Sequence, residues 1–193
     1  MALFRLPSSG PAALAPRGHG LLLRAPQMSD FLQWAHLREY SREYLTPWEP
    51  IWPSDDLTRS GFRRRLRRYA EDIAADRSYP FVVFRESDGA MIGGITLANV
   101  RRGVAQAGSI GYWIGEPFAR MGYMRAAVRA LIPFSFQSLR LHRLEAACIP
   151  SNAASVGLLE STGFTREGYA RRYLCINGIW QDHLLYARIA DDP

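Results

Sequence analysis

Apolar positions in the first part of the chain recur mainly at helical spacing. The apolar run GLLLRA, residues 20–25, predicts a first strand, and helices are predicted over about 29–44 and about 54–76. Between these helices lies TPWEPIWP, residues 46–53, which contains too many prolines for the interior of a helix or a sheet. Its two tryptophans form either a packed corner or one wall of a substrate pocket. The residues able to cap the helices are Ser29 or Asp30 for the first and Ser54 or Asp55 for the second.

The second part of the chain changes to short apolar-rich runs that are typical of strands. Two of these runs are joined by Asn177-Gly178, the strongest two-residue hairpin signal in the chain. Helices are expected over 122–139, with a bend at Pro133, and over 152–161. The order of elements predicts one α/β domain in which a mixed sheet has helices on both faces. The predicted strands cover 80–86, 91–100, 109–114, 143–149, 164–176 and 179–189.

The first 19 residues differ from the rest, because they contain three prolines and no acidic residue precedes Asp30. Arginine without acid is a feature of transit peptides, but the prolines prevent an amphipathic helix, and the apolar core of a signal peptide is missing. We therefore expect a flexible tail over 1–19 and a single domain over 20–193.

With 48% hydrophobic and 12% aromatic residues, this 193-residue chain has the composition of a globular protein. No apolar run approaches the ~20 residues of a membrane helix, so no membrane span or membrane partner is expected. Cys148 and Cys175 lie in apolar, strand-like runs, and two cysteines provide neither a disulfide framework nor metal-ligand spacing. The simplest expectation is a reducing, cytoplasmic compartment and a site without metal.

The basic residues are unusual, since all 24 of them are arginine. The absence of lysine excludes a lysine Schiff base and a P-loop lysine. A net charge of +6 favours an anionic ligand or a nucleic-acid-rich neighbour. Six arginines fall within Arg59 to Arg68, and this run is either the solvated face of a helix or a contact with the ribosome or RNA.

A strand, a glycine-bearing turn and a helix start follow one another between Ala107 and Ala126. The first N–H groups of a helix have no partner inside the helix, and the helix dipole is positive there. Arg120 and Arg125 flank the turn, and no acidic residue lies between Glu116 and Glu145. The segment is therefore interpreted as a cradle for a pyrophosphate, with an ordinary strand-to-helix connection as the alternative.

Several short motifs, in order and at compatible spacing, resemble those of the GNAT N-acetyltransferases of the RimJ/RimL ribosomal-protein type. The resemblance covers about 20–189. It implies an α/β (α+β) GNAT fold whose central mixed, mostly antiparallel sheet of about seven strands is flanked by about four helices, with an acetyl-CoA cleft where the fourth and fifth strands splay. The motifs are YLTPWEP (44–50), GYWIG (111–115), LHRLE (141–145), PSNAAS (150–155), GFTREG (163–168) and NGIWQDH (177–183).

Two positions depart from the family pattern. Ala119 stands where the phosphate loop often has Gln or Arg, and Met124 stands at its last small position. A cradle of backbone N–H groups survives both changes, so acetyl-CoA is still expected as the co-substrate. Some relatives also place a carboxylate before the residue that corresponds to Tyr173, whereas this chain has Arg172, which leaves the general base open.

Three groups of residues are expected to contact the co-substrate. Amides around Trp113 and Ile114, at an implied strand bulge, would polarise the thioester carbonyl. Asn152 would contact the pantetheine amides, or act only as a helix cap. The phosphate loop comprises Arg120, Met121, Gly122, Tyr123, Met124, Arg125 and Ala126.

Acetyl transfer also needs a proton donor and a proton acceptor. Ser155 is the expected donor to the CoA thiolate, unless its hydroxyl only bonds its own helix turn. Glu145 is the expected base, with pairing to Arg143 as the structural alternative. Asp182 and His183 are further candidates for the base. Cys148 is not expected to act as a nucleophile, since it lies in an apolar strand.

The acceptor amine is expected to reach the thioester between residues 46–53 and the Asn177 hairpin. The residues assigned to substrate binding are Trp48, Glu49, Trp52 and Tyr173, with Glu49 able to hold an ammonium group. The leading hypothesis is acetylation of the N-terminal alanine or serine of a ribosomal protein by a monomer or homodimer without DNA contact. The alternatives are a small amine as the acceptor and a non-catalytic factor that binds CoA or the ribosome.

Overall fold

A computed structural model describes residues 16–192 of the chain. The predicted tail lies outside the described residues except for its last four, and two of these, Arg17–Gly18, form the short strand β1. Among the described residues, no helix is long and apolar enough to cross a membrane.

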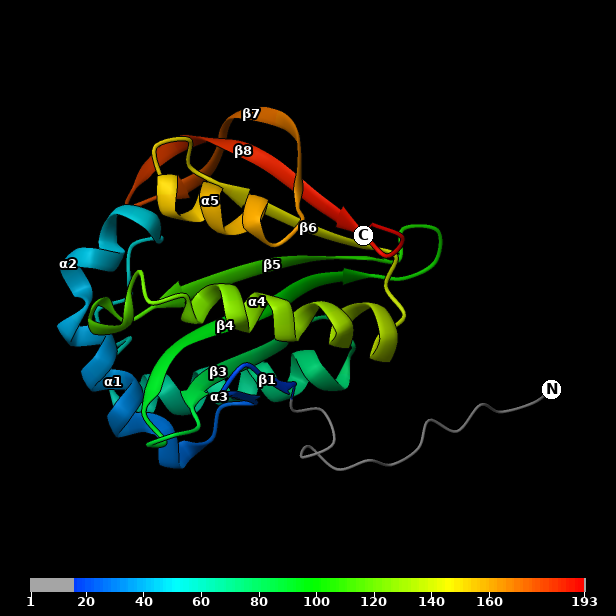
Figure 1. Cartoon of the computed structure of the whole chain (residues 1–193). Coiled ribbons are helices and arrows are strands. Elements are labelled where there is room, and N and C mark those ends of the chain that lie inside the picture. The colour runs from blue at the N-terminus through cyan, green and yellow to red at the C-terminus, as the bar shows by residue number, and fades with distance from the viewer. Residues whose placement is uncertain (1–15, 193) are drawn as a thin grey trace.

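The framework is one eight-stranded sheet in the order β1-β2-β3-β4-β5-β6-β8-β7 (Figure 1). All neighbouring strands are antiparallel except β5 and β6, which are parallel. This mixed, mostly antiparallel arrangement confirms the predicted fold class. The remaining strands are β2 (Leu21–Arg24), β3 (Tyr79–Arg85), β4 (Met91–Arg101), β5 (Ala107–Ile114), β6 (Arg143–Cys148), β7 (Thr165–Ile176) and β8 (Ile179–Ile189).

The parallel pair β5–β6 opens soon after it begins. Residues Ala107, Gly108 and Ser109 of β5 pair with Arg143, Leu144 and Glu145 of β6, and no further pairing follows. The rest of β5 stays bonded to β4, while the rest of β6 stays bonded to β8. The two halves of the sheet therefore separate beyond Ser109, which leaves a gap in the middle of the sheet.

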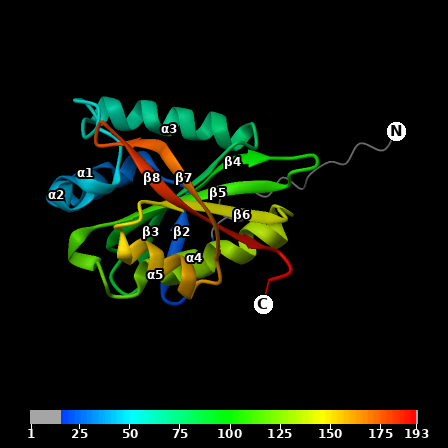
Figure 2. The ribbon, with the colours of Figure 1, turned by 90° about the horizontal axis from the view of Figure 1, so that it is seen from above.

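Helices cover both faces, as the order of elements predicts (Figure 2). One face carries α3 together with α1, and the other carries α4 and α5. The α-helices are α1 (Phe31–Tyr40), α2 (Arg42–Leu45), α3 (Arg59–Ala74), α4 (Tyr123–Pro133) and α5 (Ala153–Ser161). Shorter helical turns are η2 (Met28–Asp30), η3 (Thr46–Trp48), η4 (Glu116–Phe118) and the π-helical η5 (Phe134–Ser138).

The predicted first helix is wrong in two details. It is divided at Ser41, whose hydroxyl accepts a hydrogen bond from the Glu116 amide at 2.9 Å. Asp30 does not cap α1 with its side chain; it accepts the Gln27 amide at 2.7 Å and so closes the turn before the helix. Both differences come from bonds that local spacing does not reveal.

The second helix begins later than predicted. Its cap is Thr58, whose side chain accepts the Gly61 amide at 3.0 Å, rather than Ser54 or Asp55. The preceding loop folds back so closely that a Cβ on Gly61 would lie 2.3 Å from the Asp55 carbonyl oxygen. The helix is mostly exposed, and its one buried side chain is Phe62, with a ring centroid 4.8 Å from that of Trp34.

Helix α4 and the last hairpin agree with prediction. Met124, Val128 and Leu131 are buried on one side of α4, and the regular helix ends at Pro133, where the chain continues as a π-helix. At the hairpin, Asn177 and Gly178 have φ values of 45° and 79°, the positive values of a type I′ turn.

Candidate active site

The gap between β5 and β6 presents backbone N–H groups that have no partner strand. Gly115 donates its amide to Ile92 of the β4 side at 2.9 Å, and amides alternate in direction along a strand. The Trp113 amide therefore also faces β4, whereas the amides of Tyr112 and Ile114 face the gap. Of the two predicted donors to a carbonyl oxygen, only Ile114 has the required direction. The β4–β5 register is regular from Ser109 to Ile114, so the implied bulge at Trp113 is absent.

The turn after β5 shows the predicted features of an anion cradle. Gly122 has a φ of 80°, a left-handed conformation that is costly for residues with a Cβ, and helix α4 begins at the next residue. The helical hydrogen bonds of α4 begin with the Ala126 amide, which donates to the Gly122 carbonyl oxygen at 3.1 Å. The amides at the start of α4 thus lack acceptors inside the helix.

Side chains around this turn add positive charge. Arg120 and Arg125 are exposed, and neither forms an ion pair with a carboxylate within residues 16–192. Tyr123 accepts a hydrogen bond from Arg85 at 3.1 Å, while the Met124 side chain is buried in the core. Met124 can therefore meet a ligand only through its backbone, which explains why a bulky residue fits at this position.

Two hydroxyl groups meet on the α5 face of the sheet, beside the gap. The Tyr112 hydroxyl lies 2.7 Å from Oγ of Ser155, so the Ser155 hydroxyl contacts Tyr112 rather than its own helix turn. Burial raises the pKa of Tyr112, and its hydroxyl therefore stays protonated and can donate to Ser155. Asn152 caps α5, since its Oδ1 accepts the Ser155 amide at 3.0 Å, which leaves its NH₂ group as a donor.

Tyr112 is a residue that the sequence reasoning missed. Ile110, Tyr112 and Ile114 share one face of β5 because side chains alternate along a strand, and this signal was available in the sequence. Cys148 lies on the same side, and burial raises the pKa of its thiol, which disfavours a thiolate nucleophile.

Glu145 is the last residue of β6 that pairs with β5. Its carboxylate accepts from Arg101 at 2.5 Å and from Arg143 at 3.1 Å, so the paired state named as the structural alternative is the one observed. Both oxygens of this carboxylate already accept from guanidinium groups, so Glu145 is poorly placed to receive an amine.

His183 lies on β8 beside the end of β6, where Leu184 pairs with Cys148. Leu184 belongs to the core with α4 and α5, so alternation places His183 on the opposite face of the sheet. The imidazole is 2% exposed, and its Nδ1 lies 3.0 Å from the Gln181 carbonyl oxygen. A carbonyl only accepts, so Nδ1 carries the hydrogen and Nε2 is left as an acceptor.

Two neighbours of His183, Tyr173 and Asp182, make different contacts. The Tyr173 ring stands edge-on to His183, with centroids 5.7 Å apart. Asp182 accepts hydrogen bonds from the Tyr169 hydroxyl and the Arg172 amide, and these bonds lower the pKa of its carboxyl. Asp182 is therefore a structural link across the β7–β8 hairpin rather than a free proton acceptor.

The TPWEPIWP loop is held against the sheet by a buried arginine. Arg38 of α1 forms a bidentate pair with Glu49 at 2.9 and 2.6 Å, and Glu49 also accepts from Trp52 Nε1 at 2.7 Å. The guanidinium lies 4.1 Å from the Trp52 ring and 5.0 Å from the Trp113 ring. Because both Glu49 oxygens are occupied, Glu49 is poorly placed for its predicted role of holding an ammonium group.

The same loop contacts the β7–β8 hairpin. The Asn177 amide donates to the Glu49 carbonyl oxygen at 2.9 Å, and a Cβ on Gly178 would lie 3.2 Å from Ile51. Trp48 on the loop and Tyr173 on β7 are both partly exposed near this junction. Arg38, which organises the loop, was also missed, although it follows Trp34 at helical spacing.

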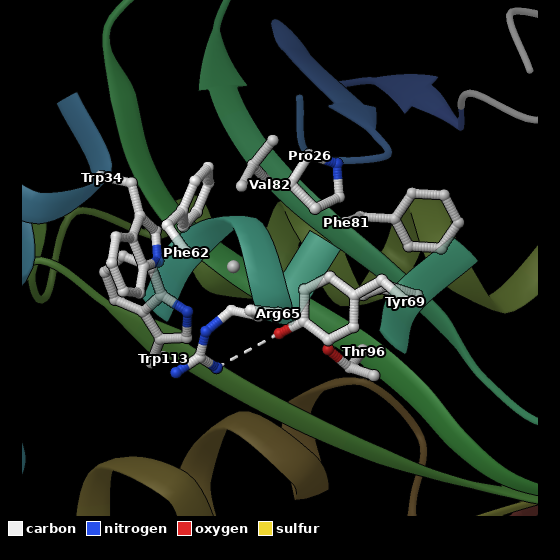
Figure 3. A pocket seen from close by; sticks show the side chains of 11 residues that line it. Pro26, Trp34, Phe62, Arg65, Tyr69, Phe81, Val82, Thr96 and Trp113 are labelled. Carbon is white, nitrogen blue, oxygen red and sulfur yellow. Dashed lines mark hydrogen bonds between the residues drawn. The ribbon is translucent and has the colours of Figure 1, made fainter. Parts of the chain in front are cut away.

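A small cavity beneath α3 is not a substrate site. Its volume of about 40 Å³ has room for a few water molecules at most. Figure 3 shows Trp34, Phe62 and Trp113 around it, with Arg65 directed toward the Tyr69 hydroxyl. A substrate of more than a few atoms therefore does not fit in this cavity.

Comparisons with known proteins show which protein family the chain resembles. Residues 20–165 match the family described as an acetyltransferase (GNAT) domain. The chain is 34% identical over 176 residues to the probable N-acetyltransferase YjcK of Bacillus subtilis (strain 168), covering 91% of this chain and 97% of that protein. It is 33% identical over 172 residues to the ribosomal protein uS5-alanine N-acetyltransferase of Escherichia coli (strain K12), covering 89% of each. The solved structure of Mycobacterium smegmatis RimJ in complex with CoA-disulfide is 32% identical, with a TM-score of 0.85 and coverage of 92% of this chain and 85% of that chain.

Proposed function

This chain belongs to the GNAT acetyltransferase family, and we propose that it transfers the acetyl group of acetyl-CoA to the N-terminal α-amino group of a ribosomal protein that begins with alanine or serine. The observation that carries the proposal is the open β5–β6 gap, with the anion cradle of α4 at its end and an acceptor route on the opposite face. The named activity of the Escherichia coli relative supports the class of acceptor.

The residues of the cradle fit a CoA diphosphate. Gly122 allows the turn to expose the first amides of α4, and Arg120 and Arg125 supply charge without competing carboxylates. The NH₂ group of Asn152 would donate to a pantetheine carbonyl. The presence of CoA-disulfide in the Mycobacterium smegmatis structure supports this assignment. When bound, acetyl-CoA supplies the acetyl group as a thioester.

The acceptor must lose a proton before it can attack. An α-ammonium group has a pKa of about 7.7–8.0, so a modest base is sufficient. We assign this step to Nε2 of His183 rather than to Glu145, because Glu145 is paired with Arg101 and Arg143. His183 takes one proton from the ammonium group and later releases it to solvent.

The remaining steps use groups that face the gap. The Ile114 amide stabilises negative charge on the thioester oxygen while the new carbon–nitrogen bond forms. Ser155 then gives its proton to the departing sulfur as the carbon–sulfur bond breaks. The second proton of the amine nitrogen restores the Ser155 hydroxyl, so the sum of all steps releases one proton.

The proposed class of acceptor also suggests where the enzyme acts and which surface contacts the ribosome. A ribosomal-protein substrate would place the enzyme in the cytoplasm, where such proteins are made. Arg63 and Arg67 of α3 are exposed and form no ion pair in the described part of the chain, so residues 59–68 are available to contact the ribosome.

The proposal is tested by measuring thiol release from acetyl-CoA with ten-residue peptides that begin with Ala, Ser or Met, and with spermine and an aminoglycoside. We expect turnover with the Ala and Ser peptides, and the product should carry the acetyl group on its α-nitrogen by mass spectrometry. Turnover with spermine or the aminoglycoside alone would replace the proposal by a small-amine acceptor. CoA binding without turnover of any acceptor, intact ribosomal proteins included, would favour a non-catalytic factor.

A further inference from the structure

A groove runs between the TPWEPIWP loop and α3, and we call it the loop–helix groove. Its volume is about 510 Å³, within the range of binding sites and more than ten times that of the cavity beneath α3. One wall consists of the prolines and apolar side chains of the loop, and the other is the arginine-rich side of the helix. It is lined by Arg38, Glu49, Pro50, Ile51, Trp52, Pro53, Asp55, Asp56, Gly61, Arg64, Arg65 and Arg68.

The inner end of the groove lies next to the proposed catalytic gap. Arg38 lines the groove and lies 5.0 Å from the Trp113 ring on β5. Tyr112 and Ile114, the neighbours of Trp113 in the chain, are the residues whose amides face the gap. A polypeptide whose N-terminus reaches the gap would therefore find the groove open to its next residues.

The charges along the groove are almost balanced. Its three carboxylates are all paired with arginines that line it, as Glu49 with Arg38, Asp55 with Arg64, and Asp56 with Arg65. Arg68 is exposed and has no carboxylate within ion-pair distance among residues 16–192. It leaves one unneutralised positive charge in the groove.

The length of the groove sets the position at which a ligand would meet that charge. Gly61 and Arg68 both line it and are separated by seven residues of helix, or about 10 Å at 1.5 Å per residue. An extended peptide covers this distance with about three residues at ~3.3 Å each. One or two further residues are needed to reach the gap, so the side chain opposite Arg68 is about the fifth of the acceptor at most.

We propose that the loop–helix groove binds the first residues of the acceptor polypeptide in extended form, and that an acidic side chain at one position between the second and about the fifth residue pairs with Arg68. This inference rests on the proposed function and adds a specificity rule to it. The apolar loop wall suits uncharged side chains at the intervening positions. A nucleic-acid strand is disfavoured in the groove itself, because three carboxylates line it.

The chain offers a matched control for the test. Arg63 and Arg68 lie on the same helix, both are exposed, and neither has an ion-pair partner in the described structure, but only Arg68 lines the groove. Glutamate at either position changes the net charge of the protein equally. A difference in charge preference between Arg63→Glu and Arg68→Glu therefore comes from binding in the groove and not from general attraction between enzyme and peptide.

The experiment measures kcat/KM for Ala-first peptides that carry Glu, Gln or Lys at each of positions 2 to 6. With the wild type we expect kcat/KM of the Glu peptide to exceed that of the Lys peptide by about fivefold at one position from 2 to 5, the effect expected from a partly exposed ion pair. Arg68→Glu should reverse that order, Arg68→Gln should abolish it, and Arg63→Glu should preserve it. Melting temperature and CoA affinity of each variant show that the fold is intact.

The outcomes separate the two proposals. If no peptide is acetylated by the wild type, the proposed function fails. If peptides are acetylated but kcat/KM does not depend on charge at any position, or if Arg63→Glu and Arg68→Glu act alike, the groove is not the acceptor site and the inference is overturned.

Discussion

The hydroxyl of Tyr112 lies 2.7 Å from Oγ of Ser155, and this contact joins β5 to the first turn of α5 beside the gap in the sheet. When the tyrosine donates to Ser155, the serine hydrogen points away from Tyr112 and is available to another acceptor. The pair therefore orients a proton donor where the proposed reaction needs one.

Replacing Ser155 with Ala should lower kcat by about 10²-fold, the lower end for loss of a positioned proton donor, with little change in CoA affinity. Tyr112→Phe should lower kcat about fivefold, since it removes one hydrogen bond of about 1 kcal/mol. In the double variant the two losses should not add, because Tyr112 acts through Ser155. Steady-state kinetics of the four proteins measure this, and additive losses would contradict the pairing.

Burial of Tyr112 also has a consequence for pH dependence. Because burial raises the pKa of Tyr112, phenolate formation should not reduce kcat below about pH 10, the ordinary value for tyrosine. A kcat profile from pH 6 to 10 measures this, and Tyr112→Phe controls for other groups. An alkaline loss present in the wild type and absent from the variant would contradict it.

Gly122→Ala should weaken acetyl-CoA binding and lower the melting temperature, because a Cβ at a φ of 80° costs about 1–2 kcal/mol. For a chain of this size, that corresponds to a few degrees. Gly157→Ala is the control, since Gly157 is an exposed position inside α5 with nothing within 4 Å of a Cβ. It should be neutral or stabilising by up to ~1 kcal/mol. Calorimetry and the KM for acetyl-CoA distinguish the two.

His183→Asn should lower kcat/KM about 10²-fold for an α-amino peptide, because the base is lost while an amide NH₂ can still donate to the Gln181 carbonyl. The loss should be much smaller for a peptide with an aminooxyacetyl terminus, which is neutral at the assay pH and needs no base. Equal losses for both acceptors would mean that His183 only supports the fold.

Phe62→Ala should destabilise the protein by about 3–5 kcal/mol, the range for removing a buried aromatic side chain. Phe62 is 1% exposed and is the only buried side chain of α3. Its loss should therefore also weaken the packing of α3, which forms one wall of the loop–helix groove. Leu32→Ala is the control, since Leu32 is 74% exposed and its replacement should cost less than ~0.5 kcal/mol. Urea unfolding measures both.

Much of this architecture is predictable because it is local. Three features each depend on the conformational limits of one or two residues. They are the Asn177-Gly178 turn, the glycine before α4, and the change from α-helix to π-helix after Pro133. The alternation of β5 would likewise have placed Tyr112 with Ile110 and Ile114.

The parts that escaped prediction depend on contacts between distant segments. Spacing cannot show that Arg101 of β4 reaches Glu145 of β6, or that Arg38 is buried against Trp113. Nor does the motif around Trp113 reveal which amides face the gap, since this direction follows from the register of β4 against β5.

Every ion pair found among residues 16–192 uses a guanidinium group, and the printed sequence contains no lysine. A guanidinium stays protonated at any physiological pH and offers no neutral nitrogen to a thioester. An enzyme that works beside a pool of acetyl donors thus carries no side-chain amine that could be modified by its own reaction or by that pool. Its arginine network should keep its charge however long the protein persists, and amine-directed labels should find no side chain to modify.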